Sequence, residues 1–513
     1  MTNAITRFTH APETATITGS TPVKDSSEMR ASPTLLFLQL NELNFPFIED
    51  YANRGLLPNF ARFFDRHGYV ETVSESEHHL ANPWIQWPTV HTGLDYQDHG
   101  VFRLGDIVKT DHPSIYDVLE SHGIKIAALG AFNARNSTKN PAFFVPDPWT
   151  KTGVTGPASV LRINDAIRQV TDDYAKNRIS TKSIANLALG GAANMKWRRI
   201  PSYLMETARF VRGEKWMRAV VGDRLLGDTF LTQCARYKPQ FATLFVNGGA
   251  HLQHHYMFSS SAYKGENCNP AWIVPEGKDP LLDVLKLYDQ LLGDTVKFAN
   301  SIPGGRVMMA TALHQEPHER ETFYYRLDDE AAFLRRMGID FQTTYRLMTE
   351  DFVVSFETEE EAAKAERMIL DIESHGTDPI FYVETGDSAV RTLATSPRIF
   401  HIENRGRDLY VQLRPMSKAI PKGAGARRGN ILIENFDSLI SFAQYKNTHH
   451  HGVGYFSDSG YLRGELPGCF PLREIYPLIL AGFGIRHPKV DNMTPALASV
   501  VCGRSNKRTT QAA

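Results

Sequence analysis

The segment Leu35-Leu-Phe-Leu-Gln-Leu-Asn-Glu-Leu-Asn-Phe45 decides the fold of this chain. It begins as an apolar run and ends in polar residues, and a helical pattern follows it up to Gly68. Such a run is typical of a strand buried on both faces of a parallel sheet. Because ligands of open α/β sheets bind at the carboxyl ends of the strands, Asn41 and Glu42 are candidate site residues. The alternative is that Asn41 only turns the chain, since asparagine adopts turn conformations readily.

Three later segments repeat this arrangement, because each has an apolar run that leads into, or lies beside, histidine-containing polar sequence. They are residues 241–255, 306–315 and 448–456. If their strands share one sheet with residues 35–40, then His251, His314 and His450 converge beside Asn41. This convergence is the central hypothesis from the sequence. The alternative for each histidine is a solvated loop or a hydrogen bond to a backbone carbonyl.

The bulk composition is that of an ordinary globular protein. The chain has 513 residues, 42% hydrophobic and 22% charged, with a net charge of −1, so nucleic acid is not an expected partner. Its four cysteines have neither C-x-x-C spacing nor clustering, so they suggest neither a zinc ribbon nor a disulfide framework, and a reducing compartment is expected. There is no signal-peptide pattern and no run of about 18 apolar residues. We therefore expect a cytoplasmic protein without a transmembrane segment.

The order of the predicted elements favours an α/β fold with a mostly parallel central sheet flanked by helices. A helix at 114–123 leads into a strand at 124–129, and this β-α-β succession implies right-handed crossovers. Residues 74–105 are expected to form a loop segment. The expected organisation is a core at 33–332 and 421–502, a helical insertion at 155–236, an α+β insertion at 333–420, and disordered tails at 1–32 and 503–513.

Residues 196–218 alternate basic and aromatic side chains within the helical insertion. A basic amphipathic helix can lie on a membrane surface or bind an acidic partner, and the alternative is a solvated face. The oligomeric state is not predicted from the sequence.

Several motifs, in their order, resemble the alkaline-phosphatase superfamily, in particular its type I phosphodiesterase and nucleotide pyrophosphatase branch. They are Thr92-Gly-Leu with His99-Gly, Asn247-Gly-Gly-Ala-His251, Leu313-His-Gln315 and His450-x-x-x-Gly454. The resemblance covers roughly 33–150, 240–315 and 430–486. It implies an α/β fold whose strand ends hold two divalent metals, usually zinc, beside a Thr, Ser or modified Cys nucleophile.

The chain departs from that pattern at the metal carboxylates and at the nucleophile. Asn41, Asn247 and Leu313 stand at the carboxylate positions, and the nucleophile position falls near Asn82 or Pro83. Zinc pairs are held partly by anionic oxygen, so the two-metal site is not expected. We expect one divalent ion, zinc with iron or manganese as alternatives. The expected ligands are His251, His314 and His450, and His255 and Glu42 offer substitutes.

The remaining candidate residues follow from the same alignment. Glu42, His78 and His79 are the candidate catalytic groups, and Asn41, Asn82 and Asn247 the candidate substrate-binding groups. The expected function is metal-dependent hydrolysis or transfer of a small phosphate or sulfate ester. The alternatives are a binding or scaffolding protein that has lost catalysis, and a non-hydrolytic enzyme with a repurposed pocket.

Overall fold

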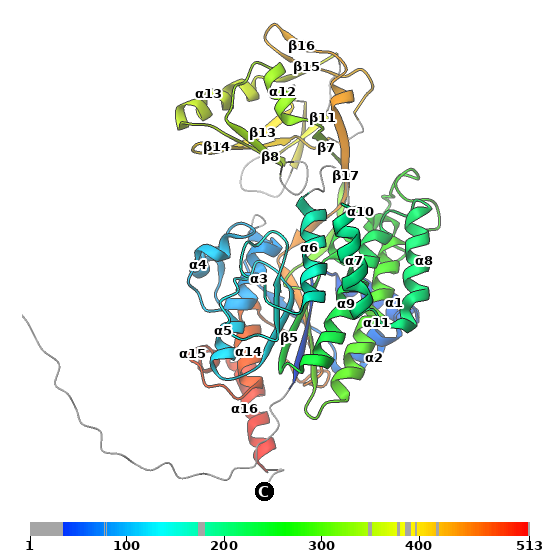
Figure 1. The fold of residues 1–513 in the computed structure, drawn as a ribbon, viewed down its shortest axis with the longest axis vertical. Helices are drawn as coiled ribbons and strands as arrows, with labels where there is room; N and C mark the ends of the chain where they lie inside the picture. The colour runs from blue at the N-terminus through cyan, green and yellow to red at the C-terminus, as the bar shows by residue number, and fades with distance from the viewer. Residues whose placement is uncertain are drawn as a thin grey trace, which may run out of the picture.

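The computed structural model describes residues 34–75, 77, 80–172, 180–346, 351–376, 380–384, 391–395, 398–416 and 420–510. These residues form a large α/β body and a smaller α+β module, which a long two-stranded ribbon connects (Figure 1). His78 and His79, two of the candidate catalytic residues, lie outside the described residues.

The α/β body is built on an eight-stranded sheet in the order β19-β2-β18-β6-β1-β5-β3-β4. Strand β1 (Leu35–Leu40) lies at its centre, parallel to both β5 (Phe241–Val246) and β6 (Arg306–Ala310). Strand β18 (Val453–Asp458) is antiparallel to β6. The others are β2 (Val70–Val73), β3 (Ile126–Ala131), β4 (Phe143–Pro146) and β19 (Cys469–Pro471). The predicted fold class, a mostly parallel sheet with flanking helices, is confirmed.

Strand β1 is apolar along its whole length because both of its faces are covered. All six of its residues are buried. Leu36, Leu38 and Leu40 contact one hydrophobic core, and Leu35 and Phe37 contact the other, as alternation along a strand requires.

Two layers of helices cover the sheet. One core contains side chains of α1 (Phe45–Asn53), α2 (Pro58–His67), α9 (Met217–Tyr237) and α11 (Pro280–Asn300). The other contains side chains of α3 (Pro83–Thr92), α5 (Ile115–Ser121), α14 (Ile475–Gly482) and α16 (Pro495–Thr510). Helix α2 ends at Gly68, whose φ of 68° suits glycine. Helix α16 extends into the segment expected to be a disordered tail.

Helix α3 corrects the expected loop at 74–105. It begins with Pro83 at its first turn and ends at Gly93, a left-handed C-cap, although Pro88 lies inside it. Every residue of α3 except Trp84 is buried. Tertiary packing therefore stabilises a helix whose proline content argues for a loop.

The helical insertion contains α6 (Ala158–Asp172), α7 (Thr181–Asn194), α8 (Ile200–Val211) and α9. Among the described helices, none combines the length and apolar composition that crossing a bilayer requires. The short helices α4 (Tyr96–His99) and α15 (Pro488–Asp491) lie on the opposite side of the body (Figure 1).

The α+β module is reached through the antiparallel ribbon of β7 (His314–Leu327) and β17 (Ile440–His451). Its main sheet has the order β13-β14-β9-β8, and a separate hydrophobic core stabilises it. Thr358 caps α13 by accepting a hydrogen bond from Glu361 N. The module contains α12 (Glu330–Arg336), β8 (Thr343–Arg346), β9 (Asp351–Ser355), α13 (Glu359–Leu370), β10 (Glu373–His375), β11 (Ile380–Glu384), β12 (Arg391–Thr395), β13 (Phe400–Arg405), β14 (Asp408–Leu413), β15 (Gly425–Arg428) and β16 (Ile431–Ile433).

His91, on α3, makes the stability of the body sensitive to acid. Burial lowers the pKa of His91 from 6.5 to about 3, and Gln39 contacts its Nε2 at 2.9 Å. Between these two pKa values the unfolded chain binds a proton that the folded chain does not, so folding stability falls as the pH falls. Between pH 7 and pH 5 the free energy of unfolding should fall by about 2 kcal/mol more in the natural protein than in the His91→Gln variant. Urea unfolding at both pH values measures this, and an unchanged pH dependence would contradict it.

Candidate metal centre

Glu42 lies directly after β1 in a turn that the surrounding backbone holds in place. Its φ is 57°, an uncommon value for a residue with a side chain. Its N–H donates to Thr311 O at 3.1 Å, and its carbonyl accepts from Gln315 N at 3.1 Å and from Gln253 Nε2 at 2.8 Å. These bonds tie Glu42 to the elements on both sides of β1. The side chain is therefore directed into the body, where it is only 3% exposed.

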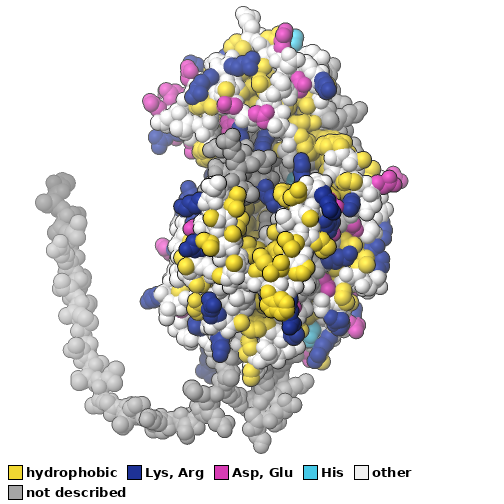
Figure 2. Space-filling model, turned by 45° about the vertical axis from the view of Figure 1, so that its right-hand side comes forward, with side chains coloured by type: hydrophobic (Ala, Val, Ile, Leu, Met, Phe, Trp, Pro, Cys, Tyr) yellow, Lys and Arg dark blue, Asp and Glu magenta, His cyan; other side chains and the backbone are white. Residues whose placement is uncertain are grey.

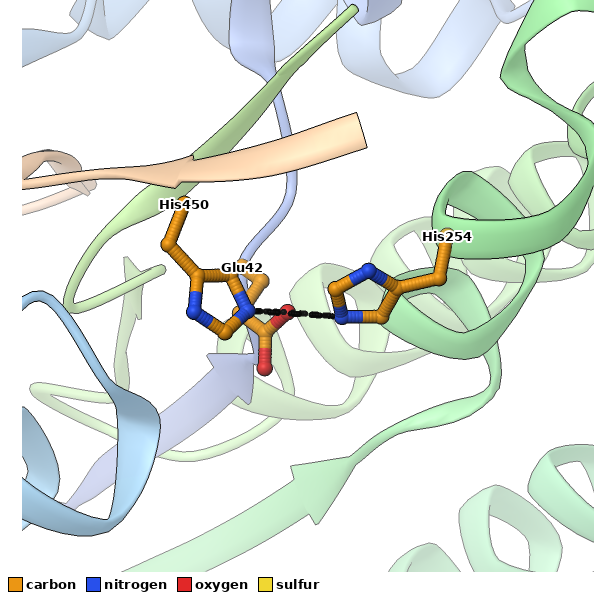
Figure 3. Close-up of side chains that lie close together, drawn as sticks. All are labelled: Glu42, His254 and His450. Carbon is orange, nitrogen blue, oxygen red and sulfur yellow. Dashed lines mark hydrogen bonds and ion pairs between the residues drawn. The ribbon is translucent and has the colours of Figure 1, made fainter. Parts of the chain in front are cut away.

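Two histidines meet the carboxylate of Glu42 (Figure 3). His254, on α10 (Gly248–Tyr256), and His450, on β17, each place Nε2 at 3.0 Å from Glu42 Oε2. The two Nε2 atoms are 3.3 Å apart. Three segments that are distant in the sequence therefore bring three metal-ligand atoms within 4.8 Å of one another.

The tautomer of His254 follows from its neighbours. The hydroxyl of Thr448 donates its hydrogen to Gln315 Oε1 at 2.6 Å. Gln315 is oriented this way because its Nε2 donates to Glu42 Oε2 and to Ala250 O. The Thr448 oxygen, 3.2 Å from His254 Nδ1, can therefore only accept, so Nδ1 carries the proton. Nε2 of neutral His254 then presents a lone pair toward Glu42.

His450 has the same arrangement. Its Nδ1 is 3.2 Å from Asn82 Oδ1, an acceptor, so Nδ1 donates, and in the neutral ring Nε2 presents its lone pair. Asn82 lies at the N-terminal end of α3, and this contact brings that helix end to the site. The two imidazoles and Glu42 thus aim three electron-pair donors at one point, which only a proton or a metal cation can occupy favourably.

The electrostatics of the group favour an ionised Glu42 beside a neutral His254. Burial acts to raise the pKa of Glu42, but charge and hydrogen-bond donation from His450 and His254, which need a proton on a ring Nε2, act in the opposite direction, and the pKa lies well below its ordinary value. Burial lowers the pKa of His254, against the opposing effect of Glu42. Glu42 is therefore ionised, and His254 is neutral near neutral pH.

Asn41 both turns the chain and orients the site. Its Nδ2 donates to Glu42 Oε1 at 2.8 Å and to Asn247 Oδ1 at 2.7 Å. Its Oδ1 accepts from Trp87 Nε1 at 2.8 Å. Asn41 thereby fixes the second oxygen of the Glu42 carboxylate, while Oε2 remains for the histidines.

The histidines expected to share one site lie in three groups. His450 contacts Glu42, as described above. His314 belongs to a second group of potential ligands with Glu316 and His451, and its Nδ1 contacts Val453 O at 2.6 Å. His251 and His255 contact each other, with ring centroids 4.5 Å apart. Burial lowers the pKa of His251 to about 4.

Sequence reasoning missed His254. The spacing of His251 and His255 places them on the same side of a helix, and the structure has this pairing. The side of α10 that faces Glu42 is set by how the helix leaves β5. At its start, Gly248 N donates a hydrogen bond to Asp223 and Gly249 N donates one to Tyr288. The only signal in the sequence was that His254 belongs to the same His-Leu-Gln-His-His run.

No family model matches the chain, and no curated protein matches it. Among solved structures, phosphonoacetate hydrolase from Sinorhizobium meliloti 1021 in complex with phosphonoformate is 11% identical, with a TM-score of 0.37. The match covers 88% of this chain and 96% of that chain. Human ectonucleotide pyrophosphatase/phosphodiesterase 5 is 9% identical, with a TM-score of 0.38, over 88% of this chain and 95% of that one. Both solved structures are therefore similar to this chain only at low identity.

Proposed function

We propose that this protein is a metal-dependent hydrolase or transferase of phosphate or related esters, with one divalent ion held by Glu42, His254 and His450. The observation that carries the proposal is the convergence of three lone-pair donors on one point. Both imidazoles are fixed in the tautomer that a metal requires, by Thr448 and by Asn82. The ion we propose is zinc, with iron or manganese as alternatives.

The donor set fits such an ion. One carboxylate oxygen and two imidazole nitrogens are ligands that zinc, iron and manganese accept, and three protein ligands leave a coordination position open. The amides at Asn41 and Asn247 are neutral, so Glu42 is the single anion among these residues. A divalent ion here keeps one net positive charge, which suits an anionic ester.

The chemistry supplied by a bound ion is to polarise a phosphoryl oxygen and to bring the pKa of a water ligand to about 7. The residues of the chain orient the metal ligands and bind the substrate. Asn41 and Gln315 hold the Glu42 carboxylate, and Thr448 and Asn82 hold the imidazoles. The N-terminal end of α3, beside His450, favours a negatively charged group of the substrate.

Metal analysis and an ester screen test the proposal. Protein purified without a histidine tag is expected to contain about one zinc, iron or manganese ion per chain. The metal-loaded protein should turn over at least one class among phosphomonoesters, phosphodiesters and sulfate esters, and a chelator should abolish that turnover. A metal-free protein that is indifferent to chelators would contradict the proposal and favour the ligand-binding alternative.

The same donor set favours a second candidate, a non-hydrolytic enzyme. Two histidines and one carboxylate with open positions are the ligands of mononuclear non-haem iron(II) oxygenases. The identity of the metal separates the candidates. Iron in the purified protein, substrate-dependent oxygen uptake and no ester turnover would favour this second function.

Thr448→Val tests the tautomer argument. Valine keeps the shape of threonine but cannot accept the hydrogen bond that Nδ1 of His254 donates, so we expect the metal affinity to fall by about 10–100-fold. Thr295→Val is the matched control, because Thr295 is also buried and its hydroxyl donates to Leu291 O, away from the site. Competition with a chromophoric chelator measures both affinities. Equal affinities in the two variants would contradict the assignment.

A further inference from the structure

Helix α8 is oriented with its apolar side toward solvent. Its inward side is held by polar groups, because Tyr203 OH donates to Asp228 Oδ2 at 3.1 Å and buried Glu206 forms an ion pair with Arg224. Its outward side exposes Leu204 at 67% and Val211 at 77%. A surface helix of a soluble domain normally has the reverse arrangement. These anchors fix the orientation of α8, so its apolar side stays at the surface.

The apolar surface extends beyond α8. Trp197, immediately before the helix, is 73% exposed, and α7 adds Ile184 and Leu189. Figure 2 shows hydrophobic side chains gathered on the face where these helices lie, with lysine and arginine side chains near them. The exposed apolar residues of the segment 197–211 are Trp197, Ile200, Leu204, Met205, Phe210 and Val211. A patch of this extent marks an interaction surface.

The patch is hollowed between the two helices. A cavity of about 480 Å³ opens there, lined by Ala188 and Ala192 of α7 and by Trp197 and Leu204 beside and on α8. Its lining is almost entirely apolar and includes Tyr203. The cavity therefore suits a hydrocarbon group.

The exposed charges of the segment that carries the patch all have one sign. Within residues 180–218, all of which are described, every charged side chain classed as exposed is basic. They are Lys182, Arg198, Arg212, Lys215 and Arg218. Both acidic residues of this stretch form ion pairs, Glu206 with Arg224, and Glu214 with Arg209 and Lys278. The whole chain has a net charge of −1, so this positive charge is local.

We propose that the outer face of α7 and α8, with Trp197, docks on a lipid bilayer that carries anionic headgroups. Apolar side chains surrounded by lysine and arginine are the arrangement of helices that lie in a bilayer interface. Trp197, beside Arg198, combines an apolar ring with a polar N–H, as residues at headgroup level do. The charge pattern disfavours a second copy, because two identical faces would bring like charges together.

Co-sedimentation with vesicles tests the proposal on the full-length protein. We expect binding to vesicles of phosphatidylcholine and phosphatidylserine in equal parts, and at least about tenfold weaker binding to phosphatidylcholine alone. Trp197→Ser with Leu204→Ser should weaken binding to the anionic vesicles by about tenfold or more. Arg198→Gln with Arg212→Gln and Lys215→Gln should weaken it on the order of 100-fold.

The matched control is Trp272→Ser with Leu462→Ser. These residues are 65% and 52% exposed and lie outside the patch, so the control should bind vesicles as the natural protein does. All positions substituted are exposed, and circular dichroism and metal content should remain unchanged in every variant. The metal content also separates this proposal from the proposed function, which involves none of these residues.

Three outcomes would overturn the proposal. The first is no binding of the natural protein to anionic vesicles. The second is a dimer that Trp197→Ser with Leu204→Ser dissolves, without vesicle binding, which would assign the face to a second copy. The third is binding to polyglutamate but to neither kind of vesicle, which would assign it to an acidic polypeptide.

Discussion

Glu42→Gln is expected to lower the metal affinity of the protein by more than about 100-fold. Substituting residues that only orient metal ligands costs about 10–100-fold, and Glu42 is the one anionic ligand of the proposed centre. Glutamine keeps the size of glutamate but removes the negative charge that offsets the charge of the ion. Metal content after dialysis, and titration of the metal-free protein by calorimetry, measure the loss.

Glu316→Gln is the matched control for this experiment. Glu316 belongs to the second group of potential ligands, with His314 and His451, and does not contact Glu42. Its substitution should leave the affinity of the Glu42 centre unchanged. Retention of the metal by Glu42→Gln together with its loss from His251→Ala would refute our ligand assignment and support the ligands expected from the sequence.

Asp458→Ala is expected to destabilise the fold by about 3–5 kcal/mol. Asp458, on β18, has a fully buried side chain and forms an ion pair with Arg306 on β6, with Arg306 Nε at 2.6 Å from Oδ1. Removing the carboxylate leaves the guanidinium, 15% exposed, without its counter-charge. The side-chain ion pair that joins β18 to Arg306, the first residue of β6, is also lost.

Chemical denaturation measures this loss, and Asp95→Ala is its control. Asp95 pairs with Arg473 at the surface, where the two side chains are 39% and 44% exposed. Exposed pairs contribute at most about 1 kcal/mol because water and salt screen them. A loss for Asp458→Ala no larger than that of the control would contradict the importance of the buried pair.

The centre of the fold could be predicted from the sequence because its pattern is local. The apolar run of β1 and its abrupt polar end place Asn41 and Glu42 at the carboxyl edge of a parallel sheet, and both residues take part in the observed network. The ribbon could not be predicted in this way. Strand β7 begins His-Gln-Glu-Pro-His-Glu-Arg-Glu, with no apolar alternation, and pairing with β17 stabilises it.

The partner of Glu42 on α10 was not predictable for a related reason. Helical spacing indicates which histidines share a side, and it pairs His251 with His255, but it does not indicate which side faces the sheet edge. That choice depends on the contacts at the start of α10 and on where β17 passes. Position along a helix is local information, whereas the direction in which the helix faces depends on tertiary structure.

The irregular pairing of β17 has a consequence for how the length of this strand can vary. Its register with β7 shifts between Lys446 and Thr448, two residues before His450, which contacts Glu42. Neighbouring residues of a strand point to opposite sides, so losing or gaining one amino acid at this shift turns His450 outward and brings His449 or His451 inward. A one-codon deletion at this shift would therefore replace His450 by a neighbouring histidine at the position beside Glu42.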